Sequence, residues 1–523
     1  MAFEVIYHDL AFPAFILLAA LSLIRFVLYP VLLSPLAQVP KAHWSCGVSP
    51  AWILWARYTN KENRTIGEAH RRYGSIVRLA PDEVSINDME SVKTVYQGGF
   101  DKHQWYSVFN NYGVPNVFCS IYAKDHSLRK RMVSHVYSKS YLHSSVSLAA
   151  QADDILNTRV LPTLDTSSHE GQAHQGIDVH SFFAAVAMDF ITAYTFGLQN
   201  SSNFIQQKAY RDHWQGLYRS RKGYSFFSQE LPLLSKLLKN WRSGAGTCAP
   251  PLSPPLAMKG VKSQTSADQP VVLRALLHGL DKEERVRGKE SPIFSTAISQ
   301  RNLTISSELF DHILAGQETT GVALTYLSWH LSQSQDLQNR LRAELLCLTP
   351  NMRMESGKVS IPNSGQLDRL PLLHAVIVET VRLYAPAGGP EPRVTPHPSC
   401  RIGSYEIPGG VRISASAYNL HRDERHFPHA EIWDHTRWLH TDDMDEERQK
   451  EMNRQFWGFS SGGRMCLGSN FAMHEMKLLV AAIYTNYTSH IVDDEGIEPT
   501  DGYTSHPTSG QLWLRFERAE LVK

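Results

Sequence analysis

The sequence predicts a mainly α-helical protein with a minor β region, arranged as one large domain behind an N-terminal apolar segment. Helix-like stretches follow one another from about residue 62 to about residue 350, short alternating strands occur in runs such as SIVRLAPDEVSIN, and residues 11–33 are almost wholly apolar. The chain has 523 residues, of which 42% are hydrophobic and 20% charged. Such a composition suits a chain that buries a sizeable core.

The apolar segment is AFPAFILLAALSLIRFVLYPVLL, residues 11–33, and it reaches the length of about 20 residues that a helix needs to cross a bilayer. Glu4 and Asp9 precede it, whereas a cleavable signal peptide would begin with basic residues. We therefore expect a transmembrane anchor. Because Arg25 would be costly at the centre of a bilayer, an in-plane or re-entrant anchor stays open.

The charges around this segment predict its orientation. Acidic residues precede it and basic residues follow it, which places residues 1–10 in the lumen and the main body in the cytosol. The basic residues are Lys41, Arg57, Lys61 and Arg64. Residues 34–61 are then a connector and residues 62–523 the domain, within which the Pro/Gly/Ser-rich stretch 243–270 is a flexible surface loop.

Charge and cysteine usage exclude several classes of protein. Lysine plus arginine total 52 against 51 acidic residues, so no net positive charge favours nucleic acid as a partner. The six cysteines lie far apart without a CxxC pair, which argues against a disulfide scaffold or a zinc site and favours a reducing compartment.

The strongest chemical signal is FSSGGRMCLG at residues 459–468. A thiolate that binds iron needs a tight loop whose backbone amides can approach the sulfur, and glycines permit that approach. The alternative is that Cys466 is a small buried hydrophobe, as most isolated cysteines are. The spacing FxxGxRxCxG favours the iron ligand, since chance gives five specified positions with a probability of roughly 10⁻⁴ in a chain of this length. The five positions are Phe459, Gly462, Arg464, Cys466 and Gly468.

Two further motifs precede the cysteine loop, AGQETT at residues 315–320 and ETVR at residues 379–382. With the three motifs in this order, the chain resembles the cytochrome P-450 family over nearly its whole length. The resemblance implies the fold of that family, a triangular helical prism with small β-sheets, and haem b as the cofactor, with Cys466 as its axial thiolate ligand.

The resemblance assigns roles on a long distal helix. Ala315 and Gly316 are small, so the helix can approach the haem and leave room for dioxygen. The Thr319 hydroxyl, together with Glu318, would organise water and deliver protons during oxygen activation. The alternative is an ordinary helix in which Glu318 is solvated and the Thr319 hydroxyl bonds back to the previous turn.

A second set of roles is structural. Glu379 and Arg382 share one helix face and can form an ion pair. The family buries this pair with a later arginine, here Arg437, as a scaffold for the cysteine loop. This chain departs from the family pattern nearby, because His435 stands where a proline is usual.

Haem carboxylates need cationic partners, and the resemblance points to four residues. Arg464 in the cysteine loop and Arg393 in PEPRVTP fit family positions, while His126 and Lys130 in HSLRKRM occupy places where tryptophan and arginine are common. Lys130 would make a looser contact than arginine because it is a point-charge donor. The alternative is an exposed basic helix face.

The implied activity is that of a haem-thiolate monooxygenase, which inserts one oxygen atom from dioxygen into a lipophilic small molecule. No flavin or nicotinamide fingerprint stands out, so we expect electrons from a separate NADPH-dependent cytochrome P-450 reductase in the endoplasmic reticulum membrane. Basic residues of this chain would form the surface on which the reductase docks. The candidates are Arg129, Arg131, Lys139 and Arg454.

The substrate is the least determined feature. The stretches HSLRKRMVSHVYSKS and AGQETTG look most like fungal members that tailor secondary metabolites, including groups similar to benzoate hydroxylases and pisatin demethylases. We expect a polyketide or terpenoid substrate. The alternatives are a detoxifying or degradative hydroxylase of small aromatics, a haem-thiolate isomerase or dehydratase that needs no dioxygen, and a non-catalytic haem- or lipid-binding protein.

Overall fold

The computed structural model describes residues 2–168, 176–222, 225–235, 265–439 and 446–519. Helices dominate these residues and the strands form small sheets, which confirms the predicted fold class. The principal helices of the body are α2 (Ala51–Tyr58), α3 (Glu62–Tyr73), α5 (Ala123–Val133), α7 (Val146–Ile155), α9 (Val179–Phe196), α10 (Lys208–Lys222), α11 (Ser225–Glu230), α14 (Val271–Arg287), α15 (Arg301–Ser332), α16 (Gln335–Leu345), α18 (Pro371–Leu383), α20 (Glu446–Gln455) and α21 (Ser469–Asn486).

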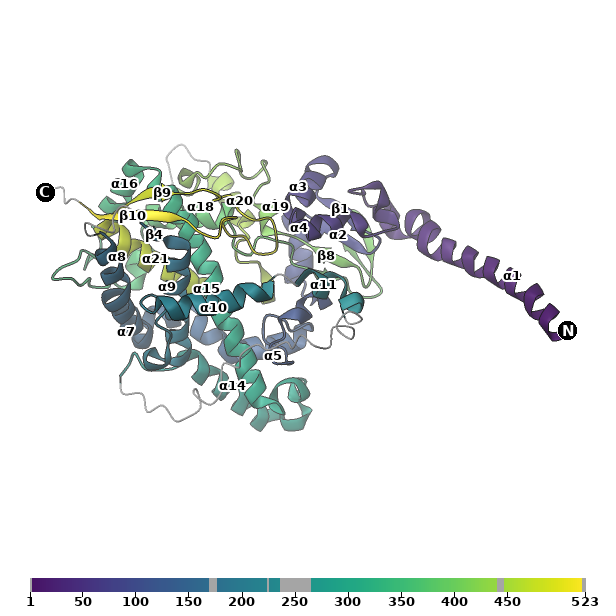
Figure 1. Ribbon diagram of the computed structural model, residues 1–523, viewed down its shortest axis with the longest axis horizontal. Helices are drawn as coiled ribbons and strands as arrows, with labels where there is room; N and C mark the ends of the chain where they lie inside the picture. The colour runs from purple at the N-terminus through teal and green to yellow at the C-terminus, as the bar shows by residue number, and fades with distance from the viewer. Residues whose placement is uncertain (1, 169–175, 223–224, 236–264, 440–445, 520–523) are drawn as a thin grey trace.

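The N-terminal segment extends away from the body (Figure 1) as α1 (Ala2–Leu23), followed by the π-helix Ile24–Leu33. Its residues Pro13–Leu33 have a mean hydropathy of 2.3 and are only 6% buried. Such a surface is unfavourable in water, so the segment is compatible with a membrane anchor. The other described helix of this length and hydropathy, α9, is 83% buried and belongs to the core.

The residues after the anchor pack on the body. Leu36 and Val39 are buried beside the first sheet, so residues 34–61 do not form an extended connector. Arg57, expected among the basic residues near the membrane, is instead buried, with its guanidinium paired to Glu62 at 2.7 Å and to Glu83. A buried pair satisfies its charge, so Arg57 contributes nothing to an exposed basic surface.

The expected flexible loop 243–270 falls largely outside the described residues. Residues 265–270 are described, and they pack against the end of α9. The Leu198 N–H donates to the Ala267 carbonyl at 3.0 Å, and Asp268 is buried.

Two glycines allow the central helices α15 and α9 to approach closely. A Cβ on Gly316 would meet Ile191 Cγ1 at 2.9 Å, and a Cβ on Gly321 would meet the Ala184 Cα at 2.9 Å. Helix α15 is therefore held against the buried α9 along this face.

The largest sheet lies on the side of the body next to α1, and β9 and β10 lie on the opposite side (Figure 1). Its strand order is β1-β2-β8-β5-β3, and the other described sheets have the orders β4-β10-β9 and β6-β7. Strand β3 pairs antiparallel with β5 so that Lys102 stands opposite Arg393. The strands are β1 (Ile76–Ala80), β2 (Glu83–Ile86), β3 (Asp101–Lys102), β4 (Ile177–Asp178), β5 (Arg393–Val394), β6 (Ser399–Ile402), β7 (Tyr405–Pro408), β8 (Arg412–Ser414), β9 (Tyr487–Asp493) and β10 (Trp513–Arg518).

Candidate active site

The cysteine loop, residues 459–468, closes on itself and leads directly into α21. The Cys466 N–H donates to the Phe459 carbonyl at 2.9 Å. Gly462 has a φ of +71°, and a Cβ there would meet the Tyr96 carbonyl oxygen at 2.3 Å. A glycine is therefore required at this position, both for the backbone conformation and for the close approach.

The Cys466 sulfur lies at the N-terminus of α21. Burial raises the pKa of the Cys466 thiol above its ordinary value, while N–H groups of Gly468 and Ser469 and the charge of Lys130 oppose the rise. The residue nevertheless has accessible surface, so the sulfur borders open space while the surrounding protein raises the cost of its charge. The amides and the helix dipole favour a thiolate, and a bound metal cation would offset the remaining cost of its burial.

Positive charge collects beside this loop, from the buried Arg464 side chain and the partly exposed Lys130. Arg464 donates to the carbonyls of Ser120 and Ile121, each at 2.6 Å. The Lys130 ammonium donates to the carbonyls of Gly463 and Met465 at 2.9 and 3.0 Å, so it contacts the cysteine loop itself.

The same cluster includes Arg393, His126 and a residue that the motifs do not mark, Lys102. Burial and then the charges of Arg393 and Arg464 hold the pKa of Lys102 well below its ordinary value. Burial and the same group of cations lower the pKa of His126 to about 2, and burial and Arg393 lower the pKa of Arg464 to about 10. The mutual repulsion shows an excess of positive charge that anionic groups would relieve.

Carboxylates of the protein neutralise part of this positive charge. Glu391 pairs with Arg393 at 3.3 Å, and Asp101 lies 3.9 Å from Arg464. The remaining excess suits the two carboxylates of a haem, and the accessible sulfur suits its iron. The residues present therefore fit a haem group. A haem-thiolate protein is the class that this fold and site define.

Helix α15 carries the expected distal residues on different faces. The Thr319 hydroxyl donates to the Ala315 carbonyl one turn earlier, at 2.8 Å, and Ala315 is exposed. The Glu318 carboxylate accepts a hydrogen bond of 2.6 Å from the Tyr218 hydroxyl of α10. Gly316 was grouped with Ala315 in the sequence-based prediction, but it packs on α9, so its small size serves contact between helices.

The structure brings Glu379, Arg382 and Arg437 together in the interior. Arg382 contacts Glu379 through two hydrogen bonds of 2.8 Å, and the Arg437 Nε donates to Glu379 Oε1 at 3.2 Å. The Trp438 indole N–H donates to the same carboxylate at 2.8 Å. Glu379 is fully buried with its oxygens satisfied, as a buried charge requires.

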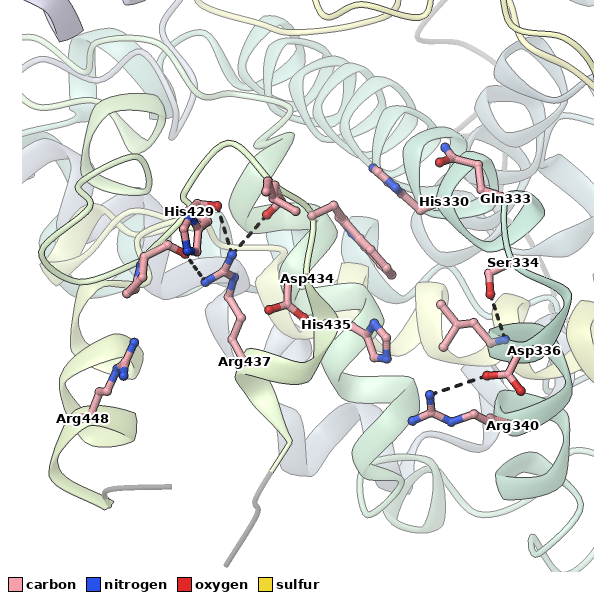
Figure 2. Close-up of a pocket in the computed structure, with 14 residues that line it drawn as sticks. His330, Gln333, Ser334, Asp336, Arg340, His429, Asp434, His435, Arg437 and Arg448 are labelled. Atoms are coloured by element: carbon pink, nitrogen blue, oxygen red, sulfur yellow. Dashed lines mark hydrogen bonds and ion pairs between the residues drawn. The ribbon is translucent and has the colours of Figure 1, made fainter. Parts of the chain in front are cut away.

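Figure 2 shows Arg437 beside a groove of about 770 Å³, where its guanidinium also donates to the carbonyls of residues 428, 429 and 432. His435 replaces the proline usual in the family, yet it begins a 3-10 turn whose N-cap is Asp434. The substitution therefore leaves Arg437 within reach of Glu379. The groove is lined by the C-terminal end of α15 and by α16, beyond Thr319 along the helix.

His421 links this cluster to the cysteine loop, and no sequence motif marked it. Its Nδ1 lies 2.8 Å from the Arg382 carbonyl, and its Nε2 accepts the Trp457 N–H at 2.7 Å. Burial, followed by the charge of Arg382, lowers the pKa of His421 to about 3, so the ring is neutral and Nδ1 carries the hydrogen. The ring also stacks on Phe456 with 5.4 Å between centroids.

The expected docking residues do not form one exposed set. Arg129 is wrong for this role, because it is buried and its guanidinium donates to the Thr296 carbonyl at 2.9 Å. Arg131 is exposed, whereas Lys139 and Arg454 are exposed but already paired with Asp368 and with glutamates of α20.

The comparisons with known proteins agree with the class. The family model for cytochrome P450 matches residues 48–513, so the chain belongs to the cytochrome P450 family, as its motifs predicted. Similar proteins include cytochrome P450 monooxygenase orf2 of Aspergillus niger, 25% identical over 92% of both chains. Cytochrome P450 monooxygenase aflV of Aspergillus parasiticus is 26% identical over 88% of this chain and 86% of its own. Cytochrome P450 monooxygenase orf4 of Eupenicillium brefeldianum is 26% identical over 99% of this chain and 100% of its own. The chain is a haem-thiolate oxidoreductase of the monooxygenase type.

Proposed function

We propose that this cytochrome P450 is a membrane-anchored enzyme of fungal secondary metabolism that oxidises a lipophilic polyketide or terpenoid. The observation that carries the proposal is the accessible Cys466 sulfur beside an excess of buried positive charge. The names of the relatives are those of fungal monooxygenases, which supports the proposed setting. Electrons come from an NADPH-dependent reductase in the endoplasmic reticulum membrane, where the apolar helix Pro13–Leu33 anchors the chain with its body in the cytosol.

The residues of the chain divide the work of holding the cofactor. Cys466 would ligate the haem iron, and the haem carboxylates would be held by Lys102, His126, Lys130, Arg393 and Arg464. When bound, haem supplies the iron at which dioxygen is reduced and activated, with electron donation from the thiolate. The buried Glu379, Arg382 and Arg437 hold the segments that flank the cysteine loop in place.

Proton delivery falls to α15. Glu318 takes up protons from solvent-connected groups and Thr319 passes them on through its hydroxyl, which turns from the Ala315 carbonyl toward water on the exposed face of the helix. The small side chain of Ala315 leaves space on the exposed face of α15, so a small molecule can lie against it.

The test is expression of the full chain with a cytochrome P450 reductase. The reduced carbon monoxide difference spectrum should show a thiolate-ligated haem, and a screen of polyketides and terpenes should yield an NADPH-dependent product that contains one atom of labelled dioxygen. Cys466→Ala should abolish the thiolate spectrum, and the matched variant at the exposed Cys347, Cys347→Ala, should keep it.

Two results would contradict the proposal. A thiolate spectrum that survives Cys466→Ala removes the ligand assignment. Turnover that continues at full rate without dioxygen and NADPH, and that Thr319→Ala leaves intact, indicates an isomerase or dehydratase instead.

A further inference from the structure

A hydrogen bond joins the acid of α15 to a different helix. The Tyr218 hydroxyl on α10 donates to Glu318 Oε2 at 2.6 Å, between residues that lie 100 positions apart in the chain. In the view of Figure 1 the ribbon of α10 crosses that of α15, and the hydrogen bond joins these two helices. A bond of this length to a carboxylate is a charge-assisted one and is stronger than a hydrogen bond between neutral groups.

The Tyr218 ring is fixed by its own helix. It stacks on Trp214 one turn earlier, with 5.6 Å between centroids and an interplanar angle of 14°. Trp214 in turn contacts Phe204, which is 2% exposed and part of the main core. Arg211 and Gln215 are buried on the same stripe of α10, so this face packs on the body. The phenol oxygen is therefore held at a defined position.

The hydrogen bond from Tyr218 restricts the conformations that are open to the Glu318 side chain. Successive residues leave a helix about 100° apart, so the Glu318 side chain does not share the direction of Thr319. A glutamate with three rotatable bonds loses conformational entropy when it is fixed, and a strong hydrogen bond offsets that cost.

We propose that Tyr218 is a positioning residue that fixes the Glu318 carboxylate for proton delivery and couples this step to the placement of α10. The inference rests on the proposed role of Glu318. Tyr218 acts through Glu318 and has no chemical step of its own. A displacement of α10 would move the phenol away from the Glu318 carboxylate. Proton delivery therefore depends on the position of α10.

The experiment uses the full-length holoenzyme with reductase and measures hydrogen peroxide formed per NADPH consumed. Without added substrate, dioxygen takes two electrons and two protons to give hydrogen peroxide, or four electrons and four protons to give two waters, so the ratio reports proton delivery directly. The same ratio is measured with 7-ethoxycoumarin as a lipophilic probe. The variants are Tyr218→Phe, Glu318→Gln and the double variant. Tyr210→Phe is the matched control, because Tyr210 lies on α10 and is 54% exposed.

If the inference holds, Tyr218→Phe diverts electrons of NADPH from the formation of water to the formation of hydrogen peroxide. The amount of water formed per NADPH falls about three- to tenfold, the order expected for losing one such hydrogen bond. The carbon monoxide spectrum and the KM for any accepted probe stay unchanged. The double variant is no worse than Glu318→Gln alone, because both changes remove one function. Tyr210→Phe behaves as the wild type.

Other outcomes separate the two ideas. If Glu318→Gln diverts NADPH to peroxide and Tyr218→Phe does not, the inference is overturned and the role of Glu318 stands. A Tyr218→Phe effect confined to KM also overturns it, since that identifies a substrate contact. If Glu318→Gln leaves the ratio unchanged, the proposed role of Glu318 fails, and the inference fails with it.

Discussion

Replacing His421 with phenylalanine should reduce the loss of stability in mild acid. Burial and then the charge of Arg382 hold the pKa of His421 at about 3, against an ordinary value of 6.5. The unfolded chain takes up this proton near pH 6.5 and the folded protein only near pH 3, so stability is lost as the pH falls through that range. One pKa unit corresponds to about 1.4 kcal/mol, so His421 alone removes about 2 kcal/mol by pH 5.

The contacts of His421 set the size of the effect at neutral pH. Phenylalanine keeps the stack on Phe456 but loses the bonds to the Arg382 carbonyl and the Trp457 N–H. A buried donor without a partner costs about 1–3 kcal/mol, so the variant is less stable than the wild type at pH 7. The difference in the free energy of unfolding between the two proteins should narrow by about 2 kcal/mol at pH 5, because only the wild type has a buried histidine that stays unprotonated there.

The assay is urea unfolding of the holoprotein at pH 7, 6 and 5, followed by circular dichroism and by the fraction of haem that keeps its thiolate ligand. His213→Gln, at an exposed histidine of α10, is the control and should follow the wild type at every pH. The reasoning is refuted if His421→Phe and the wild type lose the same free energy of unfolding between pH 7 and pH 5.

Three other changes test the cofactor cluster, the scaffold and the anchor. Lys102→Met should speed the transfer of haem to apomyoglobin by about ten- to a hundredfold, since a hydrogen bond to a charged group contributes about 1.5–3 kcal/mol, and Lys124→Met at an exposed site of α5 should not. Arg437→Ala should lower the free energy of unfolding by about 3–5 kcal/mol because its partner carboxylate stays buried, whereas Arg448→Ala in the same groove should change it by less than about 0.5 kcal/mol. Deleting residues 2–33 should free the protein from lipid vesicles in flotation without changing the carbon monoxide spectrum, and continued flotation would contradict the anchor.

Sequence patterns predicted those parts of the site whose residues all lie within one short stretch of the chain. The spacing around Cys466 implies a tight loop because Gly462 must adopt a positive φ and pass the Tyr96 carbonyl without a side chain. The spacing of Glu379 and Arg382 implies a pair on one helix face, and the pair is present. Such features depend on the order of residues within a few turns of chain.

The residues that sequence reasoning missed depend on pairings between distant segments. Lys102 joins the cationic cluster because β3 pairs with β5 in a register that sets it opposite Arg393. His421 connects two segments that a motif search treats separately. The contact of Gly316 with α9 and the burial of Arg129 beside Thr296 depend in the same way on segments outside the motifs.

The cationic cluster also explains why folding and haem binding should depend on each other. Lys102, Arg393 and Arg464 come from two strands and the cysteine loop, and their mutual repulsion opposes the pairing of β3 with β5. An anion that binds only the folded site stabilises the whole assembly through that binding. The carboxylates of haem would be such anions, so the charges proposed to bind the cofactor would also weaken the pairing of β3 with β5 before the cofactor binds.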